Sequence, residues 1–300
     1  MTLDGLLVAI RFGLYADLAA LAGLPLFWWS MRQGIGARDR LIVFLLNLGA
    51  ACLSVLWLLA SASTMAGSSL FAPDWSIVDI LLRETPIGLL LAVRAAALLL
   101  LLLLLLRSSG TERSPAAIAI CASIAAVTLA WSGHAGATEG TAGTVHRAAD
   151  IVHIIAASAW FGALLALLAM MFSAAWDLRA ARCTALALHR FSFFGTLLVA
   201  ALIFSGIING VMIVGLANLS ALPHTPYGQL LLAKLALFGG MLLLAAANRW
   251  RLTPALAAAG AGTSLDAARR HLRLSLLTES AAALAILALV AALGTLDPLG

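Results

Sequence analysis

Apolar runs long enough to cross a lipid bilayer recur along the whole chain, and they limit the possible folds more than any other feature. A helix needs about 20 apolar residues to span a hydrocarbon core about 30 Å thick. Only 10% of the 300 residues are charged, whereas 63% are hydrophobic. Backbone groups in lipid must be satisfied internally, and the unbroken Leu/Ala run at 95–106 lacks the alternation of a barrel strand. The sequence therefore predicts an all-α polytopic membrane helix bundle.

Hydropathy divides the chain into eight predicted spans. Three of them begin with a hydroxyl residue followed by proline, at Thr85-Pro86, Ser114-Pro115 and Thr225-Pro226. The hydroxyl can cap the helix, and proline fits its first turn because the N–H it lacks has no partner there. The longest expected loops are 65–85 and 249–271. The spans, which form a single transmembrane domain over residues 1–300, are 5–30, 40–64, 86–106, 115–133, 145–176, 190–217, 227–248 and 272–294.

The arginines indicate the orientation of the spans. Thirteen arginines fall in the loops after the first, third, fifth and seventh spans, whereas the opposite face has only Arg83 and Arg147. Because basic residues concentrate in cytoplasmic loops, we expect those four loops in the cytoplasm and both termini in the periplasm. The net charge of +5 then reflects membrane topology and predicts no nucleic-acid partner.

Histidines gather at the predicted outer face. His146, Asp150 and His153 follow i, i+4, i+7 spacing on one helix face, and Trp160 lies near the same stripe. His134 closes the predicted fourth span, and the short loop to His146 makes the two spans antiparallel neighbours. Histidine is the commonest metal ligand, and a carboxylate such as Asp150 can fix its tautomer. We predict a metal site formed by His134, His146 and His153, with interfacial histidines bonded to loop carbonyls as the alternative.

The ligand types narrow the choice of metal only partly. Imidazole suits copper, zinc, iron and nickel, whereas thioether sulfur favours Cu(I). Met65 and Met212 lie at predicted outer helix ends and are possible soft ligands, with core filling as the alternative. Paired histidines on adjacent spans can also be axial ligands of a b-type haem, which here would use His153 with His134 or His224.

Five charged residues lie deep inside predicted spans: Arg11, Asp17, Arg94, Lys234 and Glu279. A charge near the bilayer centre costs several kcal/mol, so such residues usually face the bundle and have a partner. One interpretation is a buried ion-pair network that orients the helices. The other is a relay that couples ion or proton movement to a conformational change.

Several segments resemble the copper resistance protein D (CopD) family of bacterial inner-membrane proteins. They are SGHA at 132–135, HRAADIVHIIAASAWFGAL at 146–164, HRFSFFGTLLVAALIFSGIING at 189–210 and TPYGQLLLAKLALFGGMLLLAAANRWRLTP at 225–254, followed by Glu279. The matching spans cover about the C-terminal three fifths of the chain. Residues 1–114 agree with the family in helix count and hydropathy more than in amino-acid sequence.

The resemblance implies a multi-pass inner-membrane protein that moves copper toward the cytoplasm or delivers it. It maps the family's histidines onto His134 and His153, with His146 as a third, and its lysine and acid onto Lys234 and Glu279. A separate periplasmic copper carrier of the CopC type would be a partner. Few methionines lie at the predicted outer face, so the oxidation state of the copper that the protein handles, Cu(I) or Cu(II), stays open.

The sequence contains no nucleophile–base pair in an enzyme-like context, no phosphate loop and no ATP-binding motif. We therefore expect that the protein is not an enzyme and that gradients or copper exchange drive any copper uptake. A non-transporting assembly factor for a copper enzyme is the remaining alternative.

Overall fold

The computed structural model describes residues 3–107, 115–172, 176–259 and 262–298, and these residues are almost entirely helical. No β-strand is present in the described ranges beyond one isolated bridge between Ser69 and Ala72. The predicted all-α class is confirmed. The helices are α1 (Leu3–Ser30), α2 (Ala37–Ala66), α3 (Trp75–Arg83), α4 (Pro86–Leu106), α5 (Pro115–Val127), η1 (Thr128–Trp131), α6 (His134–Ala137), α7 (Gly140–Met171), α8 (Leu178–Val214), η2 (Leu216–His224), α9 (Pro226–Ala247), η3 (Asn248–Leu252), α10 (Thr253–Ala258) and α11 (Thr263–Leu293).

Seven of the described helices are long and apolar enough to cross a membrane. They are α1, α2, α4, α7, α8, the continuous α9–η3–α10 and α11. The predicted fourth span is observed as the apolar segment Pro115–Trp131, which is shorter than the others. Part of this segment is 3-10 helix, which rises more per residue than α-helix and lengthens the segment.

The predicted hydroxyl-proline helix starts are confirmed where the structure describes them. The Thr85 hydroxyl accepts a hydrogen bond from the Ile87 N–H at 3.2 Å, and the Thr225 hydroxyl accepts one from the Gly228 N–H at 3.0 Å. In α4 and α9 a proline occupies the first turn, where its missing donor costs nothing. Pro115 begins α5, and Ser114 lies outside the described residues.

The predicted long loops contain helices. The outer loop 65–85 holds α3, capped by Asp74, which accepts from the Ser76 N–H and hydroxyl at 2.9 and 2.6 Å. These bonds stabilise the carboxylate and lower the pKa of Asp74. The described part of the predicted inner loop 249–271 is mostly helical, because α9 continues through the π-helical η3 into α10, and α11 already begins at Thr263. The sixth span also starts earlier than predicted, at Leu178.

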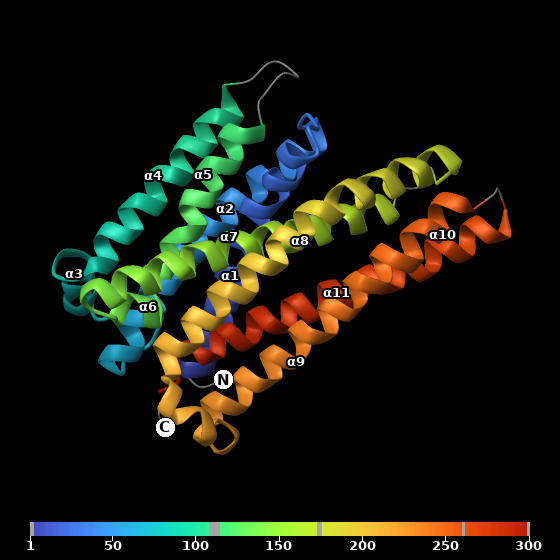
Figure 1. Cartoon of the computed structure of the whole chain (residues 1–300). Coiled ribbons are helices and arrows are strands. Elements are labelled where there is room, and N and C mark those ends of the chain that lie inside the picture. Colours follow the sequence, from blue (N-terminus) through green and yellow to red (C-terminus); the bar gives the residue numbers. More distant parts are fainter. Residues whose placement is uncertain (1–2, 108–114, 173–175, 260–261, 299–300) are drawn as a thin grey trace.

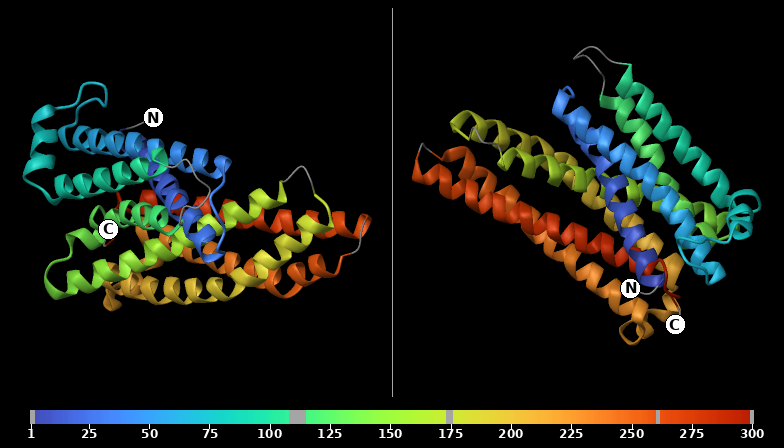
Figure 2. Two further views of the ribbon diagram at one scale, coloured as in Figure 1. Left: turned by 90° about the horizontal axis from the view of Figure 1, so that it is seen from above. Right: turned by 180° about the vertical axis from the view of Figure 1, so that it is seen from behind.

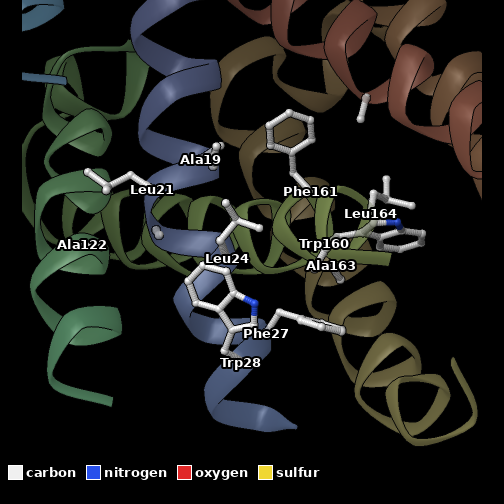
Figure 3. Packing of buried hydrophobic residues seen from close by; sticks show 14 of the residues in the cluster. Ala19, Leu21, Leu24, Phe27, Trp28, Ala122, Trp160, Phe161, Ala163 and Leu164 are labelled. Atoms are coloured by element: carbon white, nitrogen blue, oxygen red, sulfur yellow. The ribbon is translucent and has the colours of Figure 1, made fainter. Parts of the chain in front are cut away.

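Helix α1 lies at the centre of the bundle and packs against α2, α5, α7 and α11. It crosses α7 where Gly23 meets Gly162, and a Cβ on either glycine would collide with the backbone of the other helix. Small residues at such crossings let helices approach closely in lipid. Around the crossing, apolar side chains interdigitate, as Figure 3 shows for Leu24 and Phe27 of α1 and Phe161 of α7.

Helices α8 and α9 bury smaller shares of their residues than the other spans. Helix α9 packs on α11 and buries few of its own residues, and the backbones of α8 and α9 do not approach within 8 Å. Figures 1 and 2 show α8, α9 and α11 diverging from α2, α4 and α5. Both termini, η2, α3 and α6 lie toward one end of the molecule, and the ends of α4, α7 and α10 toward the other (Figure 1).

Candidate functional site

His146 lies near the start of α7, covered by the turn that precedes the helix. Its side chain is 1% exposed, and its Nδ1 forms a hydrogen bond with the Thr138 hydroxyl at 2.9 Å. The Arg147 guanidinium donates to the Thr138 carbonyl at 3.0 Å. Gly143 permits this turn of the chain, because a Cβ at that position would collide with the Thr138 carbonyl oxygen. His146 therefore faces the α6–α7 turn.

His153 lies two turns deeper in α7 and faces α8. Its Nδ1 is 3.0 Å from the Ser205 hydroxyl oxygen, and the ring lies beside Gly206, where a Cβ would make an ordinary van der Waals contact with His153 Cε1 at 3.6 Å. Ser205 donates its single hydroxyl proton to the Ala201 carbonyl at 2.6 Å. The hydroxyl must then accept from Nδ1–H of His153, which leaves a lone pair on Nε2. Metals bind histidine through either ring nitrogen, and in this tautomer Nε2 is the one available.

Asp150 lies on α7 one turn before His153. It accepts a hydrogen bond from the Asn209 amide at 3.0 Å, so Ser205 and Asn209 of α8 pair with His153 and Asp150 of α7 in register. Lys234 of α9 interacts electrostatically with both Asp150 and His153. We call Asp150, His153, Ser205, Asn209 and Lys234 the α7 polar cluster.

The α7 polar cluster was only partly predicted. Asp150, His153 and Lys234 were candidates, but Ser205 and Asn209 were not assigned to the site. Their signal is the i, i+4 spacing of two polar residues within the apolar helix α8, in SGIIN at 205–209. Two such residues in lipid require a common polar partner, which α7 supplies.

The remaining predicted ligands are dispersed. The preceding span ends in η1 at Trp131, and the chain turns before His134, which begins α6. His134 therefore does not close that span, contrary to the prediction from the sequence. The side chain of His134 lies outside the described residues. Met65 and Met212 are exposed on α2 and α8. Among the described residues, no three His, Cys, Asp or Glu side chains form a metal-binding group. The predicted three-histidine site stays a prediction.

Trp160 belongs to the hydrophobic core. It is 6% exposed, and its ring packs edge-on against Phe238 of α9 with ring centroids 6.2 Å apart. Figure 3 shows it beside Leu164 and close to Phe161 on α7. Trp160 thus connects α7 to α9 two turns beyond His153.

Arg94 and Arg11 contact hydroxyl groups and aromatic rings, but Nη2 of Arg94 and Nε of Arg11 have no hydrogen-bond partner among the described residues. Arg94, 1% exposed, donates to the hydroxyls of Thr128 and Ser54 at 2.8 and 3.2 Å and lies over the Trp57 ring. Arg11 donates to the Tyr15 hydroxyl at 2.8 Å. Within the described ranges neither forms a salt bridge, and the salt bridge observed there joins Arg83 to Asp79 on the exposed face of α3.

Asp17 and Glu279 lie apart from these arginines. Asp17 is half-buried beside Gly49, and its Oδ2 has no hydrogen-bond partner. Glu279 is 2% exposed and accepts a hydrogen bond from the Asn248 amide, where α9 changes to π-helix. At 1.5 Å per residue, Asn248 lies about 21 Å along α9 from Lys234, so Glu279 and the α7 polar cluster are at different depths.

The fold and these residues define a class: a polytopic membrane protein with polar groups gathered between helices within the membrane span. Comparison with known proteins identifies the family. The family model for copper resistance protein D matches residues 185–293, and the model for the copper resistance protein D-like N-terminal domain matches residues 1–144. The chain belongs to the copper resistance protein D family and is a multi-pass inner-membrane protein.

Individual relatives agree with this assignment. The chain is 34% identical over 303 residues to copper resistance protein D of Pseudomonas syringae pv. tomato, covering 98% of this chain and 97% of that protein. It is 37% identical over 130 residues to inner membrane protein YebZ of Escherichia coli, covering 43% and 42%. It is 36% identical over 117 residues to copper transport protein CutJ of Bacillus subtilis, covering 39% and 21%. No solved structure matches the chain.

Proposed function

We propose that this protein carries copper across the inner membrane, and that the α7 polar cluster binds the ion during passage. The names of two relatives, copper resistance protein D and copper transport protein CutJ, support copper as the substrate. The observation on which the proposal depends is the hydrogen bond from His153 to Ser205, because it leaves Nε2 of His153 able to coordinate a metal.

The proposed orientation places this cluster in the outer half of the membrane. The proposed eight crossings include the short segment Pro115–Trp131. An even number of crossings puts both termini on one side of the membrane, which agrees with their position toward the same end of the molecule (Figure 1). The arginine-rich starts of α8 and α11 and the arginines of η3 then face the cytoplasm, and the start of α7 faces the periplasm. We propose that a separate carrier of the CopC type delivers copper there.

Two positions along α7 would receive the ion in turn. His146 and His153 are seven residues apart, which is about 10 Å along the helix axis, and their Nδ1 atoms bond to different elements. That separation favours successive positions over one shared site. The outer position would use His146 with His134, and the inner position His153 with Asp150.

Lys234 gives the inner position a means of releasing the ion. A copper ion on Asp150 and His153 would compete with the ammonium group for the carboxylate, and the two cations repel one another. The charge of Lys234 therefore opposes binding of the ion and favours its departure. A carrier of this kind catalyses no chemical reaction, so we propose that the protein is not an enzyme.

Copper binding by the purified protein tests this proposal. The double variant His134→Ala/His153→Ala is expected to lose at least one copper ion per chain relative to the wild type, as measured by elemental analysis after gel filtration. The variant His224→Ala/His271→Ala is the control, since it removes the same number of imidazoles from other places. Undiminished copper in the first variant would refute the assignment of the site.

A further inference from the structure

A cavity of about 330 Å³ opens at the end of the molecule where α8, η3 and α10 meet, remote from the α7 polar cluster. Its lining combines three basic side chains with small and apolar ones: Arg182, Ala185, Leu186, His189, Arg249, Thr253, Pro254 and Ala257. Such a volume is at the small end of ligand-binding pockets and suits a compact polar group. Figure 1 shows α10 lying alongside the first half of α8.

The charge of the cavity is one-sided. Arg182 and His189 lie two turns apart on one face of α8, and Arg249 enters from η3, where its guanidinium donates to the Thr196 hydroxyl on α8 at 2.8 Å. No carboxylate is found among its described lining residues. The nearest acid along α8, Asp177, caps the helix by accepting from the Ala180 N–H at 2.8 Å. An anion with several oxygen acceptors would satisfy the two guanidinium groups.

The surroundings of the cavity indicate the level of the lipid headgroups. Trp250, next to Arg249, is 71% exposed, and tryptophan concentrates at membrane–water interfaces. Phe193 and Leu197 follow His189 along α8 toward the bilayer, and their exposed fractions are 66% and 53%. The basic cavity thus continues into an apolar surface, which is the order in which a phospholipid presents its phosphate and its acyl chains.

We propose that this cavity binds the phosphate group of an anionic phospholipid, with the acyl chains on the exposed apolar face of α8. The bound lipid adds to the existing contacts of α8 with η3 and α10. This site is independent of the copper site, since it shares no residue with the α7 polar cluster.

Native mass spectrometry of the delipidated protein, with phosphatidylglycerol added back, tests the proposal. We expect one tightly retained lipid per chain, and at least about tenfold weaker retention in Arg182→Ala/Arg249→Ala, since two charge-assisted contacts are lost. The matched control is Arg179→Ala/Arg270→Ala, which removes the same charge from exposed positions outside the cavity and should retain the lipid. Equal retention by all three proteins would overturn the proposal.

A second variant separates the cavity from general attraction to a basic surface. Ala257→Phe fills the cavity from an exposed position and keeps both arginines, so it should also lose the lipid. Retention by this variant would contradict a cavity-bound phosphate. Inorganic phosphate is the competing source of the same chemistry. If millimolar phosphate displaces phosphatidylglycerol completely, or binds where phosphatidylglycerol does not, the lipid assignment is overturned; persistence of the bound lipid in phosphate supports it.

Discussion

At the scale of single residues, the Ser205 hydroxyl decides which nitrogen of His153 is available to a metal. Its proton goes to the Ala201 carbonyl, so its oxygen can only accept from His153. Asp150 is oriented in the same way by the Asn209 amide. Both partners come from α8, and the site therefore depends on the contact between α7 and α8 as much as on the histidine itself.

Replacing Ser205 by alanine removes the acceptor and frees the imidazole to change its tautomer and its orientation. We expect copper affinity to fall by about 10–100-fold, as is usual when the partner of a ligating histidine is lost. Competitive titration with a copper chelator measures this change. The control is Thr278→Ala on α11, which removes a similar hydroxyl bonded to its own helix at 2.9 Å. An unchanged affinity in Ser205→Ala would show that this hydroxyl has no part in copper binding.

Replacing Lys234 by glutamine should separate binding from release. Removing the cation that competes for Asp150 is expected to tighten copper binding by up to about tenfold, equivalent to about 1.4 kcal/mol, and to slow transport. Lys234→Arg keeps the charge and should behave more like the wild type. Affinity and flux are measured on the same preparations. Weaker binding together with slower transport in Lys234→Gln would argue against the release role.

Residue spacing predicted the α7 candidates but not their partners. His146, Asp150 and His153 do lie along one helix, yet His146 bonds to Thr138 and His153 to Ser205. Helical periodicity shows which residues lie on one stripe. It does not show which neighbouring element covers each turn of that stripe, because this depends on how α6 and α8 pack against α7.

At the scale of helices, the Gly23–Gly162 crossing sets the distance between α1 and α7. Each glycine lies against the backbone of the other helix, so there is no flexible side chain that could move aside. The crossing also fixes α7 within the bundle, and with it the depth of His153.

The variant Gly162→Ala should therefore destabilise the protein, because the added methyl group forces α1 and α7 apart. Overpacking of this kind typically costs about 1–3 kcal/mol. A lower midpoint of thermal unfolding in detergent would report it. Gly239→Ala on α9 is the control, since a Cβ there meets nothing within 4 Å and alanine favours a helix. Equal midpoints for Gly162→Ala and the wild type would disprove the close crossing.

The starts of α4 and α9 were predicted correctly, whereas the continuation of α9 was not. Thr85-Pro86 and Thr225-Pro226 signal their helices through local chemistry, which the sequence displays directly. The extension of α9 through Asn248 into α10 has no such local signal. It coincides with the buried hydrogen bond between Asn248 and Glu279, a contact between residues 31 apart in sequence. Contacts of that kind arise only when the helices pack.

At the scale of the whole molecule, hydropathy and arginine placement predicted a helical membrane bundle, and the described helices and the family assignment confirm that class. The splayed arrangement of α8, α9 and α11 was not predicted (Figure 2). It leaves α8 and α9, which carry Ser205, Asn209 and Lys234, with few buried residues, so two of the three helices that form the α7 polar cluster have few packing constraints. A cluster placed there can change its contacts as an ion passes without disturbing the core around α1.

Copper uptake into proteoliposomes that contain the purified protein tests the central claim most directly. Wild-type protein should load the vesicles with copper faster than empty liposomes do, His153→Ala should reduce the rate toward that of the empty liposomes, and His271→Ala should leave it unchanged. Uptake by wild-type protein no faster than in empty liposomes, or full uptake by His153→Ala, would contradict a copper carrier that works through this histidine.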